Sequence, residues 1–198
     1  MLEKRYRHIY QRICINPVLK VISRKISPIF ITILSGIIGI LVVPALYFNM
    51  TLVAVGLILL SGYLDTLDGS VARYNNTTSD TGSALDIFTD RIVEGAIIIG
   101  LCLVDYHNRG FICLLMFFAI LLCITAFLIV GIFTANNSHK GFFYSEGLIE
   151  RAEAFIFFIL MIILPEHFNV LGLIFSASVL ITAFIHLGLF YKYSKSQV

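Results

Sequence analysis

Six blocks of apolar residues, each about 20 residues long, run through most of this chain. A helix of about 20 residues is needed to cross about 30 Å of hydrocarbon. The 198 residues are 59% hydrophobic and 13% charged, against roughly 25% charge in a soluble domain. We therefore predict an all-α integral membrane protein with six transmembrane helices. The expected spans are Pro28–Phe48, Thr51–Tyr74, Gly82–Val104, Phe111–Asn136, Gly147–Leu164 and Phe168–Tyr191.

The first 25 residues precede these spans and contain seven Lys and Arg. They have no long apolar core and no small-residue cleavage site, so they do not resemble a secretory signal. Several apolar residues fall roughly along one helical face: Ile9, Ile13, Val18, Leu19 and Ile22. This pattern predicts an N-terminal amphipathic surface helix (residues 1–25) before a six-helix domain (residues 26–198). The alternative is a basic flank that only sets orientation.

Lys and Arg are distributed unevenly between the loops that these spans leave. With a cytoplasmic N-terminus, 13 of the 14 fall on the inner side and only Arg109 on the outer side. Cytoplasmic loops carry the excess of positive charge, so we expect both termini on the cytoplasmic side of an inner or plasma membrane. The net charge of +2 largely reflects this bias, and no nucleic-acid partner is expected. The four cysteines lack metal-binding spacing and are expected to be reduced.

The stretch between residues 64 and 91 contains five aspartates in an otherwise apolar region: Asp65, Asp68, Asp80, Asp86 and Asp90. The first two are three residues apart and the last two four residues apart, so each pair lies on one face of its helix. The polar run Asn75–Asp80 predicts a turn that brings the two helix ends together. Charges inside a bilayer are costly unless they are paired or hydrated. Four converging carboxylates therefore indicate a function.

Four carboxylates placed together repel one another and raise one another's pKa values. One or two divalent cations would cancel this repulsion. Mg²⁺ and Mn²⁺ prefer carboxylate and water oxygens and often lie beside substrate phosphates. The cluster contains no Cys or His, which argues against zinc or copper. The residues predict a site for Mg²⁺ or Mn²⁺ at the inner membrane surface.

Small residues accompany these aspartates. Gly69 and Ala72 follow the first pair, and Gly82 lies one turn before Asp86. Residues without bulk allow a flat ligand or another backbone to come close, and Arg73 could bind a phosphate through two hydrogen bonds. Together they indicate a diphosphate or nucleotide site. Helix packing is the alternative explanation for the small residues.

The spacing of these residues resembles the signature of the CDP-alcohol phosphotransferase family. Every defined position of that signature is matched by the string Asp65-x2-Asp68-Gly69-x2-Ala72-Arg73-x8-Gly82-x3-Asp86-x3-Asp90. A smaller similarity lies at the start of the first span, where the family has Pro-Asn-x-x-Thr. Here Pro28 and Thr32 match, and Ile29 replaces the asparagine.

The resemblance implies an enzyme of phospholipid biosynthesis that binds a CDP-linked lipid, usually CDP-diacylglycerol, with two Mg²⁺ or Mn²⁺. A hydroxyl of a small polar alcohol attacks the phosphorus that carries the lipid, and CMP leaves. By position, Asp65 and Asp86 would bridge both metals, and Asp68 would complete the first metal site. Asp90 would complete the second and act as general base.

The resemblance also implies contacts to the CDP-linked lipid and a quaternary state. The expected substrate-binding residues are Pro28, Thr32, Gly69, Ala72, Arg73, Ser79 and Gly82. Many members of the family are homodimers, so a homodimer is expected.

The acceptor alcohol stays open. A segment resembling the Gly-Leu-x-Glu-Arg-x-Glu segment of inositol-phosphate-using members lies at residues 147–153 and makes Arg151 an acceptor candidate. The Lys-Ala-Arg stretch of those members is replaced by Phe133–Asn137, which leaves Lys140 as a second candidate. Inositol phosphate, glycerol phosphate, serine and an amino alcohol all remain possible acceptors.

An alternative of another class is an intramembrane divalent-cation transporter or channel. That interpretation predicts acidic residues at mid-membrane and polar residues continuing to the far side. Here the acids gather near one surface, and the outer halves of the spans are almost uninterrupted aliphatic residues. A membrane prenyl transferase would share the metal–diphosphate chemistry, but its aspartate spacing differs.

Overall fold

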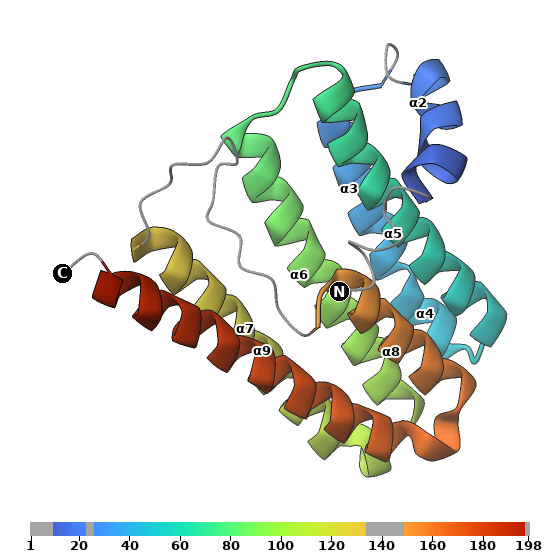
Figure 1. Ribbon diagram of the computed structural model, residues 1–198. Helices are drawn as coiled ribbons and strands as arrows, with labels where there is room; N and C mark the ends of the chain where they lie inside the picture. Colours follow the sequence, from blue (N-terminus) through green and yellow to red (C-terminus); the bar gives the residue numbers. More distant parts are fainter. Residues whose placement is uncertain (1–9, 23–25, 134–148, 197–198) are drawn as a thin grey trace. The chain divides into compact units, whose positions relative to one another are not determined.

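The computed structural model describes residues 10–22, 26–133 and 149–196, and these residues form helices without strands (Figure 1). They divide into two compact units, Leu2–His107 and Asn108–Val198, which are described separately below. The elements are η1 (Gln11–Ile15), α2 (Asn16–Ile22), α3 (Pro28–Ile40), α4 (Val42–Tyr47), α5 (Thr51–Tyr74), α6 (Asp80–Val104), α7 (Tyr106–Phe133), α8 (Arg151–Ile163), η2 (Pro165–His167) and α9 (Phe168–Ser196).

Four stretches of the described residues are long and apolar enough to cross a membrane. They are Pro28–Tyr47, Thr51–Tyr74, Tyr106–Phe133 and Pro165–Tyr191. The sequence predicts two further spans. The first corresponds to α6, which has 25 residues but carries several charged side chains, and the second to α8, which has only 13 residues. The membrane character is therefore supported, and the number of six spans stays a prediction.

In the unit Leu2–His107, α3 and α4 pack against both α5 and α6. The close approach of α3 to α6 depends on two glycines. A Cβ atom at Gly36 would lie 2.7 Å from Thr89 Cγ2, and one at Gly39 would lie 2.5 Å from Val93 Cγ2. Across the other interface, the buried hydroxyl of Ser61 donates to the carbonyl of Ser35 at 3.0 Å. These contacts fix α3 between the two helices that carry the aspartates.

The predicted first span is divided at Leu41 into α3 and α4. Pro44 explains the division, because it has no N–H to donate to the carbonyl of Ile40 four residues earlier.

A tight turn joins α5 to α6. Thr77 N–H donates to the carbonyl of Ala72 at 2.9 Å, and Asn76 N–H donates to that of Arg73 at 3.3 Å. This is a Schellman ending, and Asn76 adopts the left-handed conformation that it requires, with φ of 54°. The predicted reversal of the chain therefore has a defined geometry.

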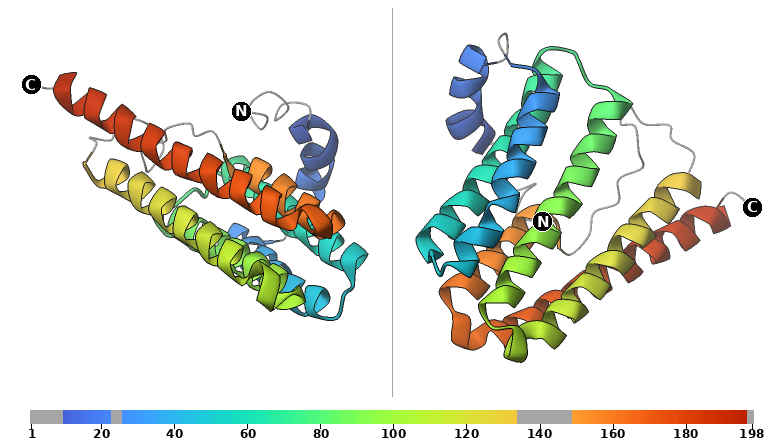
Figure 2. Two further views of the ribbon diagram at one scale, coloured as in Figure 1. Left: turned by 90° about the horizontal axis from the view of Figure 1, so that it is seen from below. Right: turned by 180° about the vertical axis from the view of Figure 1, so that it is seen from behind.

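The helical segment formed by η1 and α2 packs against α5. Figures 1 and 2 show it beside α3 and α5. Ile15 and Leu19 are buried there in a cluster with Leu67 and Val71. The π-helical turn η1 ends at Ile15, two residues before Pro17, which cannot donate a backbone hydrogen bond. Leu19 therefore contacts protein, and the placement of this segment on a lipid surface stays a prediction.

In the unit Asn108–Val198, α8 packs along α9. Phe158 of α8 and Phe175 of α9 are fully buried, with ring centroids 5.3 Å apart. At the start of α7, the buried guanidinium of Arg109 lies over the ring of Phe168, with Cζ 4.5 Å from the centroid. The one Lys or Arg residue expected on the outer side thus has an aromatic contact.

The packing of α3 on α6 gives a testable prediction about stability. Gly39→Ala places a methyl group against Val93 and is expected to destabilise the protein by about 1–3 kcal/mol. Gly56→Ala is the matched control, because nothing lies within 4 Å of its added Cβ atom, and helix propensity favours alanine there. Thermal unfolding in detergent measures both variants. Equal midpoints for the two would contradict the close α3–α6 contact.

Candidate active site

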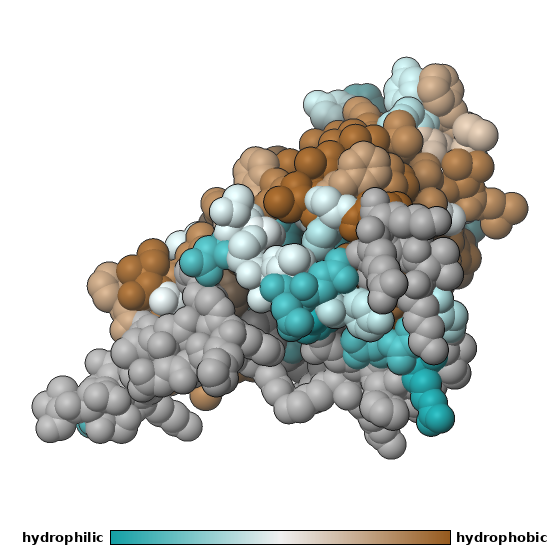
Figure 3. Space-filling view, turned by 90° about the horizontal axis from the view of Figure 1, so that it is seen from above, coloured by the Kyte–Doolittle hydropathy of each residue, from teal (hydrophilic) through white to brown (hydrophobic). Residues whose placement is uncertain are grey.

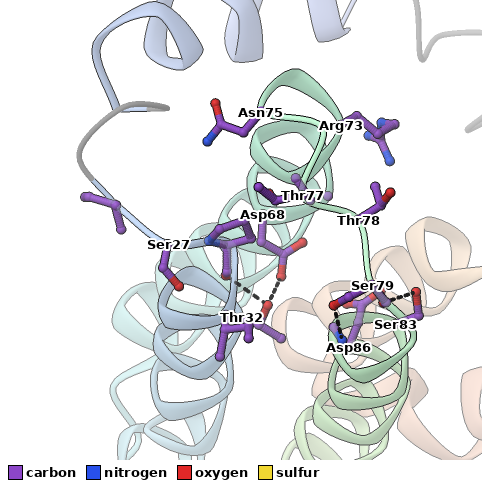
Figure 4. A pocket seen from close by; sticks show the side chains of 16 residues that line it. Ser27, Thr32, Asp68, Arg73, Asn75, Thr77, Thr78, Ser79, Ser83 and Asp86 are labelled. Carbon is purple, nitrogen blue, oxygen red and sulfur yellow. Dashed lines mark hydrogen bonds between the residues drawn. The ribbon is translucent and has the colours of Figure 1, made fainter.

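A cavity of about 610 Å³ opens at the end of the first unit where α5 and α6 are joined (Figure 4). Its wall comes from the start of α3, the last turns of α5, the connecting turn and the first turns of α6. Asp68 and Thr32 point toward each other from α5 and α3, while Asp86 belongs to α6 and Ser79 directly precedes it. Viewed from this end, the described residues form a hydrophilic area with hydrophobic residues beside it (Figure 3).

The structure brings every residue predicted to contact the CDP-linked lipid to this cavity. All of them belong to its lining: Pro28, Thr32, Gly69, Ala72, Arg73, Ser79 and Gly82. Residues from three helices converge because Asp68, Ala72 and Gly69 lie on one side of α5 at helical spacing, and α3 and the turn close the other sides. The geometry is that of a single site, and the role of each residue as a ligand stays a prediction.

Three of the four predicted metal ligands lie close together. Asp65, Asp68 and Asp86 each offer a carboxylate oxygen, and these oxygens lie within 4.8 Å of one another. Asp68 is only 4% exposed, and the Oδ1 atoms of Asp65 and Asp86 are buried. Like charges at this distance in a partly dry site strongly favour a cation between them. Because every donor is a hard oxygen, the set fits Mg²⁺ or Mn²⁺.

Asp90 lies on α6 one turn beyond Asp86, about 6 Å further along the helix axis. It shares the helix face of Asp86 but is not part of the group of three. The next residue, Arg91, forms an ion pair with the buried Glu94 at 2.7 Å. That pair compensates the charge of Glu94, which lies deeper along α6.

Thr32 connects α3 to the carboxylate cluster. Its hydroxyl lies 2.5 Å from Asp68 Oδ2 and 3.1 Å from the carbonyl oxygen of Pro28. Both Thr32 and Asp68 are about 5% exposed or less, so the bond is shielded from water. A hydroxyl donor on Oδ2 orients the carboxylate of Asp68.

Ser79 has a structural task in addition to its place in the lining. It is the N-cap of α6, and its hydroxyl oxygen accepts from Gly82 N–H at 3.1 Å. A Cβ atom at position 82 would lie 3.2 Å from that oxygen. Gly82 therefore fits closely under the cap, and the Ser79 hydroxyl hydrogen can still donate toward the cavity.

Several polar lining residues were missed by the sequence analysis: Ser27, Asn75, Thr77, Thr78 and Ser83. Three of them, Asn75, Thr77 and Thr78, lie in the polar run for which the sequence predicted only a turn. The many hydroxyl and amide side chains between the two aspartate-bearing helices could have indicated a ligand-binding segment.

Of the two acceptor candidates, the structure describes one. Arg151 is the first residue of α8, in the unit Asn108–Val198, and its Cζ lies 5.2 Å from the centroid of Phe155. Lys140 lies outside the described residues. The N-cap Glu150 and Glu153 form a capping box that fixes the start of α8 at Arg151.

Residues 25–187 match the profile of the CDP-alcohol phosphatidyltransferase family. The match covers most of the chain, and the protein therefore belongs to this family and is a transferase of this type. The membership confirms the resemblance that the aspartate signature indicates, and it does not support the alternative of a cation transporter or channel.

Two curated relatives and one solved structure are similar to the chain. Inner membrane protein YnjF of Escherichia coli is 30% identical over 188 residues, covering 90% of this chain and 91% of the relative. The phosphatidylinositol phosphate synthase of Corynebacterium glutamicum is 29% identical over 152 residues, covering 73% and 67%. The crystal structure of Mycobacterium tuberculosis phosphatidylinositol phosphate synthase (PgsA1) with CDP-DAG bound has a TM-score of 0.74 at 18% identity, covering 88% and 92%, and shows the same fold.

The Thr32–Asp68 contact gives a prediction about metal binding. Thr32→Val removes the hydroxyl at nearly constant volume and is expected to weaken Mn²⁺ binding by about tenfold, because Asp68 loses the donor that orients it. Thr32→Ser keeps the hydroxyl and is expected to stay close to the wild type. Titration of the purified protein with Mn²⁺, followed by electron paramagnetic resonance, measures both. Equal weakening in the two variants would contradict an orienting role for the hydroxyl.

Proposed function

We propose that this protein transfers a phosphatidyl group from a CDP-linked lipid, CDP-diacylglycerol, to a small polar alcohol and releases CMP. The observation that carries the proposal is the clustering of Asp65, Asp68 and Asp86 within 4.8 Å beside a cavity lined by Arg73. Family membership supplies the reaction class, and the site supplies the groups that such a reaction needs.

The four signature aspartates would hold two divalent cations, Mg²⁺ or Mn²⁺. Asp65 and Asp86 would serve both, Asp68 the first and Asp90 the second. When bound, the cations neutralise the diphosphate and stabilise the charge that develops at phosphorus. Thr32 keeps Asp68 in place for this task.

The cavity would bind the CDP part of the donor. Arg73 supplies a planar cation for the diphosphate, and Gly69, Ala72 and Gly82 leave room beside it. The hydroxyl and amide groups of the α5–α6 turn offer donors and acceptors for the cytidine. Apolar residues such as Ile29, at the start of α3, also line the cavity. The lipid chains of the donor would continue from there into the bilayer.

Asp90 is proposed as the general base. Its carboxylate takes the proton of the acceptor hydroxyl while the acceptor oxygen bonds to the phosphorus that carries the lipid. The bond from this phosphorus to the bridging oxygen breaks, and CMP leaves with the electron pair. A carboxylate is a weak base at neutral pH, so its contribution depends on position.

The acceptor is proposed to be a phosphorylated polyol such as inositol phosphate or glycerol phosphate, with serine and amino alcohols as the other candidates. A relative named phosphatidylinositol phosphate synthase supports the first class. Arg151 and Lys140 are the proposed acceptor contacts. We further propose that six spans place both termini and the site on the cytoplasmic face, and that the enzyme is a homodimer.

A release assay tests the reaction and the acceptor together. Purified protein in detergent receives CDP-diacylglycerol, Mn²⁺ or Mg²⁺, and one acceptor at a time: inositol phosphate, glycerol phosphate, serine, inositol or ethanolamine. CMP release with one acceptor, absent without metal, is expected. No release with any acceptor, together with no metal-dependent binding of a cytidine nucleotide, would overturn the proposal.

Asp90→Asn tests the proposed base. The substitution is expected to lower the rate of CMP release by at least about a hundredfold, because an amide cannot take the proton. Asp80→Asn is the matched control, since Asp80 is an exposed carboxylate on the first turn of the same helix outside the cavity lining. It is expected to stay within about twofold of the wild type. Similar rates for both variants would exclude a base at position 90.

A further inference from the structure

The guanidinium of Arg73 lies over the backbone of Gly69 on α5. A Cβ atom at Gly69 would lie 3.2 Å from Nη1, 3.7 Å from Nη2 and 3.8 Å from Cζ of Arg73. The three distances are similar, so the flat face of the guanidinium covers the glycine. Gly69 therefore makes room for the arginine side chain, in addition to any room that it leaves for a ligand.

Ser70 provides a hydrogen-bond acceptor at the edge of this guanidinium. Arg73 Nη2 donates to Ser70 Oγ at 3.3 Å, and the Ser70 hydroxyl donates to the carbonyl of Thr66 at 2.8 Å. The side chain of Ser70 is buried, with 3% exposure. Because the Ser70 hydroxyl hydrogen is donated to the carbonyl of Thr66, the orientation of this hydroxyl is fixed. Its oxygen can then accept hydrogen bonds from neighbouring side chains.

The second donor to Ser70 comes from the N-terminal helical segment. Gln11 Nε2 lies 3.5 Å from Ser70 Oγ. The position of Gln11 is set by the packing of its own segment, where Ile15 and Leu19 are buried against α5 and the Tyr63 hydroxyl donates to the carbonyl of Cys14 at 3.2 Å. The N-terminal segment thus reaches the residue that accepts from Arg73.

The contacts lie on two different sides of α5. At about 100° per residue, Ser70 lies about 60° around the helix from Leu67, which packs on the N-terminal segment, and about 60° in the other direction from Arg73, which lines the cavity. Ser70 thus stands between the two sides. It is therefore placed to connect the packing of the N-terminal segment with the arginine that lines the cavity.

We propose that Ser70 is a positioning residue that holds the Arg73 guanidinium ready for the diphosphate of the donor, and that Gln11 supports it from the N-terminal segment. The inference rests on the proposed function, since it takes the ligand of Arg73 to be a diphosphate. An arginine already held in one orientation loses less side-chain freedom when the ligand binds. The N-terminal segment then contributes to donor affinity without touching the donor.

A double-mutant cycle on nucleotide binding tests this proposal. The probe is CDP with Mn²⁺, titrated calorimetrically into purified protein up to millimolar concentrations, so that no turnover is needed. Ser70→Ala is expected to weaken CDP binding by about three- to tenfold, the usual range for one hydrogen bond. In the Arg73→Ala background the same change is expected to have no further effect. Ser70→Thr, which keeps the hydroxyl, is expected to restore most of the affinity.

Ser61→Ala is the matched control, because Ser61 is a fully buried serine of the same helix whose hydroxyl bonds α3 instead of Arg73. It is expected to lower thermal stability and leave CDP affinity unchanged. Gln11→Ala is expected to weaken CDP binding less than Ser70→Ala does, in the same direction, and it leaves the core of the helix bundle intact.

The possible outcomes separate this inference from the proposed function. A wild-type protein that does not bind CDP with Mn²⁺ overturns the proposed function and this inference with it. Wild-type binding together with an unchanged affinity of Ser70→Ala overturns the inference alone. If Ser70→Ala lowers the CDP affinity equally in the wild type and in the Arg73→Ala variant, the inference is also overturned, because the effect would then not depend on Arg73.

Discussion

The mutual repulsion of three carboxylates is the constraint on which the rest of the first unit depends. Asp65, Asp68 and Asp86 come from two helices, and their oxygens lie within 4.8 Å. Without a cation, this repulsion favours separation of α5 and α6. The helices must therefore be held together by contacts elsewhere. Gly39 lets α3 approach α6, the buried Ser61 bonds α3 to α5, and the Schellman turn at Asn76 fixes the connection.

The same contacts explain why α3 matters for the site although it carries no carboxylate. Thr32 stands at the start of α3 and bonds Asp68, so the packing that resists the repulsion also orients one member of the cluster. Ser27 caps α3 by accepting from the N–H of Phe30 at 3.4 Å, and both Ser27 and Pro28 belong to the cavity lining. The helix that holds the bundle together therefore also forms one wall of the cavity.

The sequence predicted the arrangement of α5 and α6 well because the constraints are local. Periodicity gave α5 its observed bounds, and the aspartate spacing placed three carboxylates together. Hydrophobic periodicity did not predict two features that depend on single residues. One is the break at Leu41, which Pro44 causes. The other is the start of α8 directly after the capping residue Glu150. The bonds of Thr32 to Asp68 and of Gln11 to Ser70 join residues 36 and 59 positions apart, and no spacing rule reaches that far.

The donor-binding residues and the acceptor candidate Arg151 lie in different compact units of the chain. Every residue proposed to bind the donor lies between Pro28 and Asp90, in one compact unit, and the signature fixes most of them. Arg151 belongs to the other unit, and the stretch that carries cations in inositol-phosphate-using members is Phe133–Asn137 here. A donor site shared by all members can stay constant while the second unit changes with the acceptor. Family membership therefore supports the CDP-linked donor more strongly than any one alcohol.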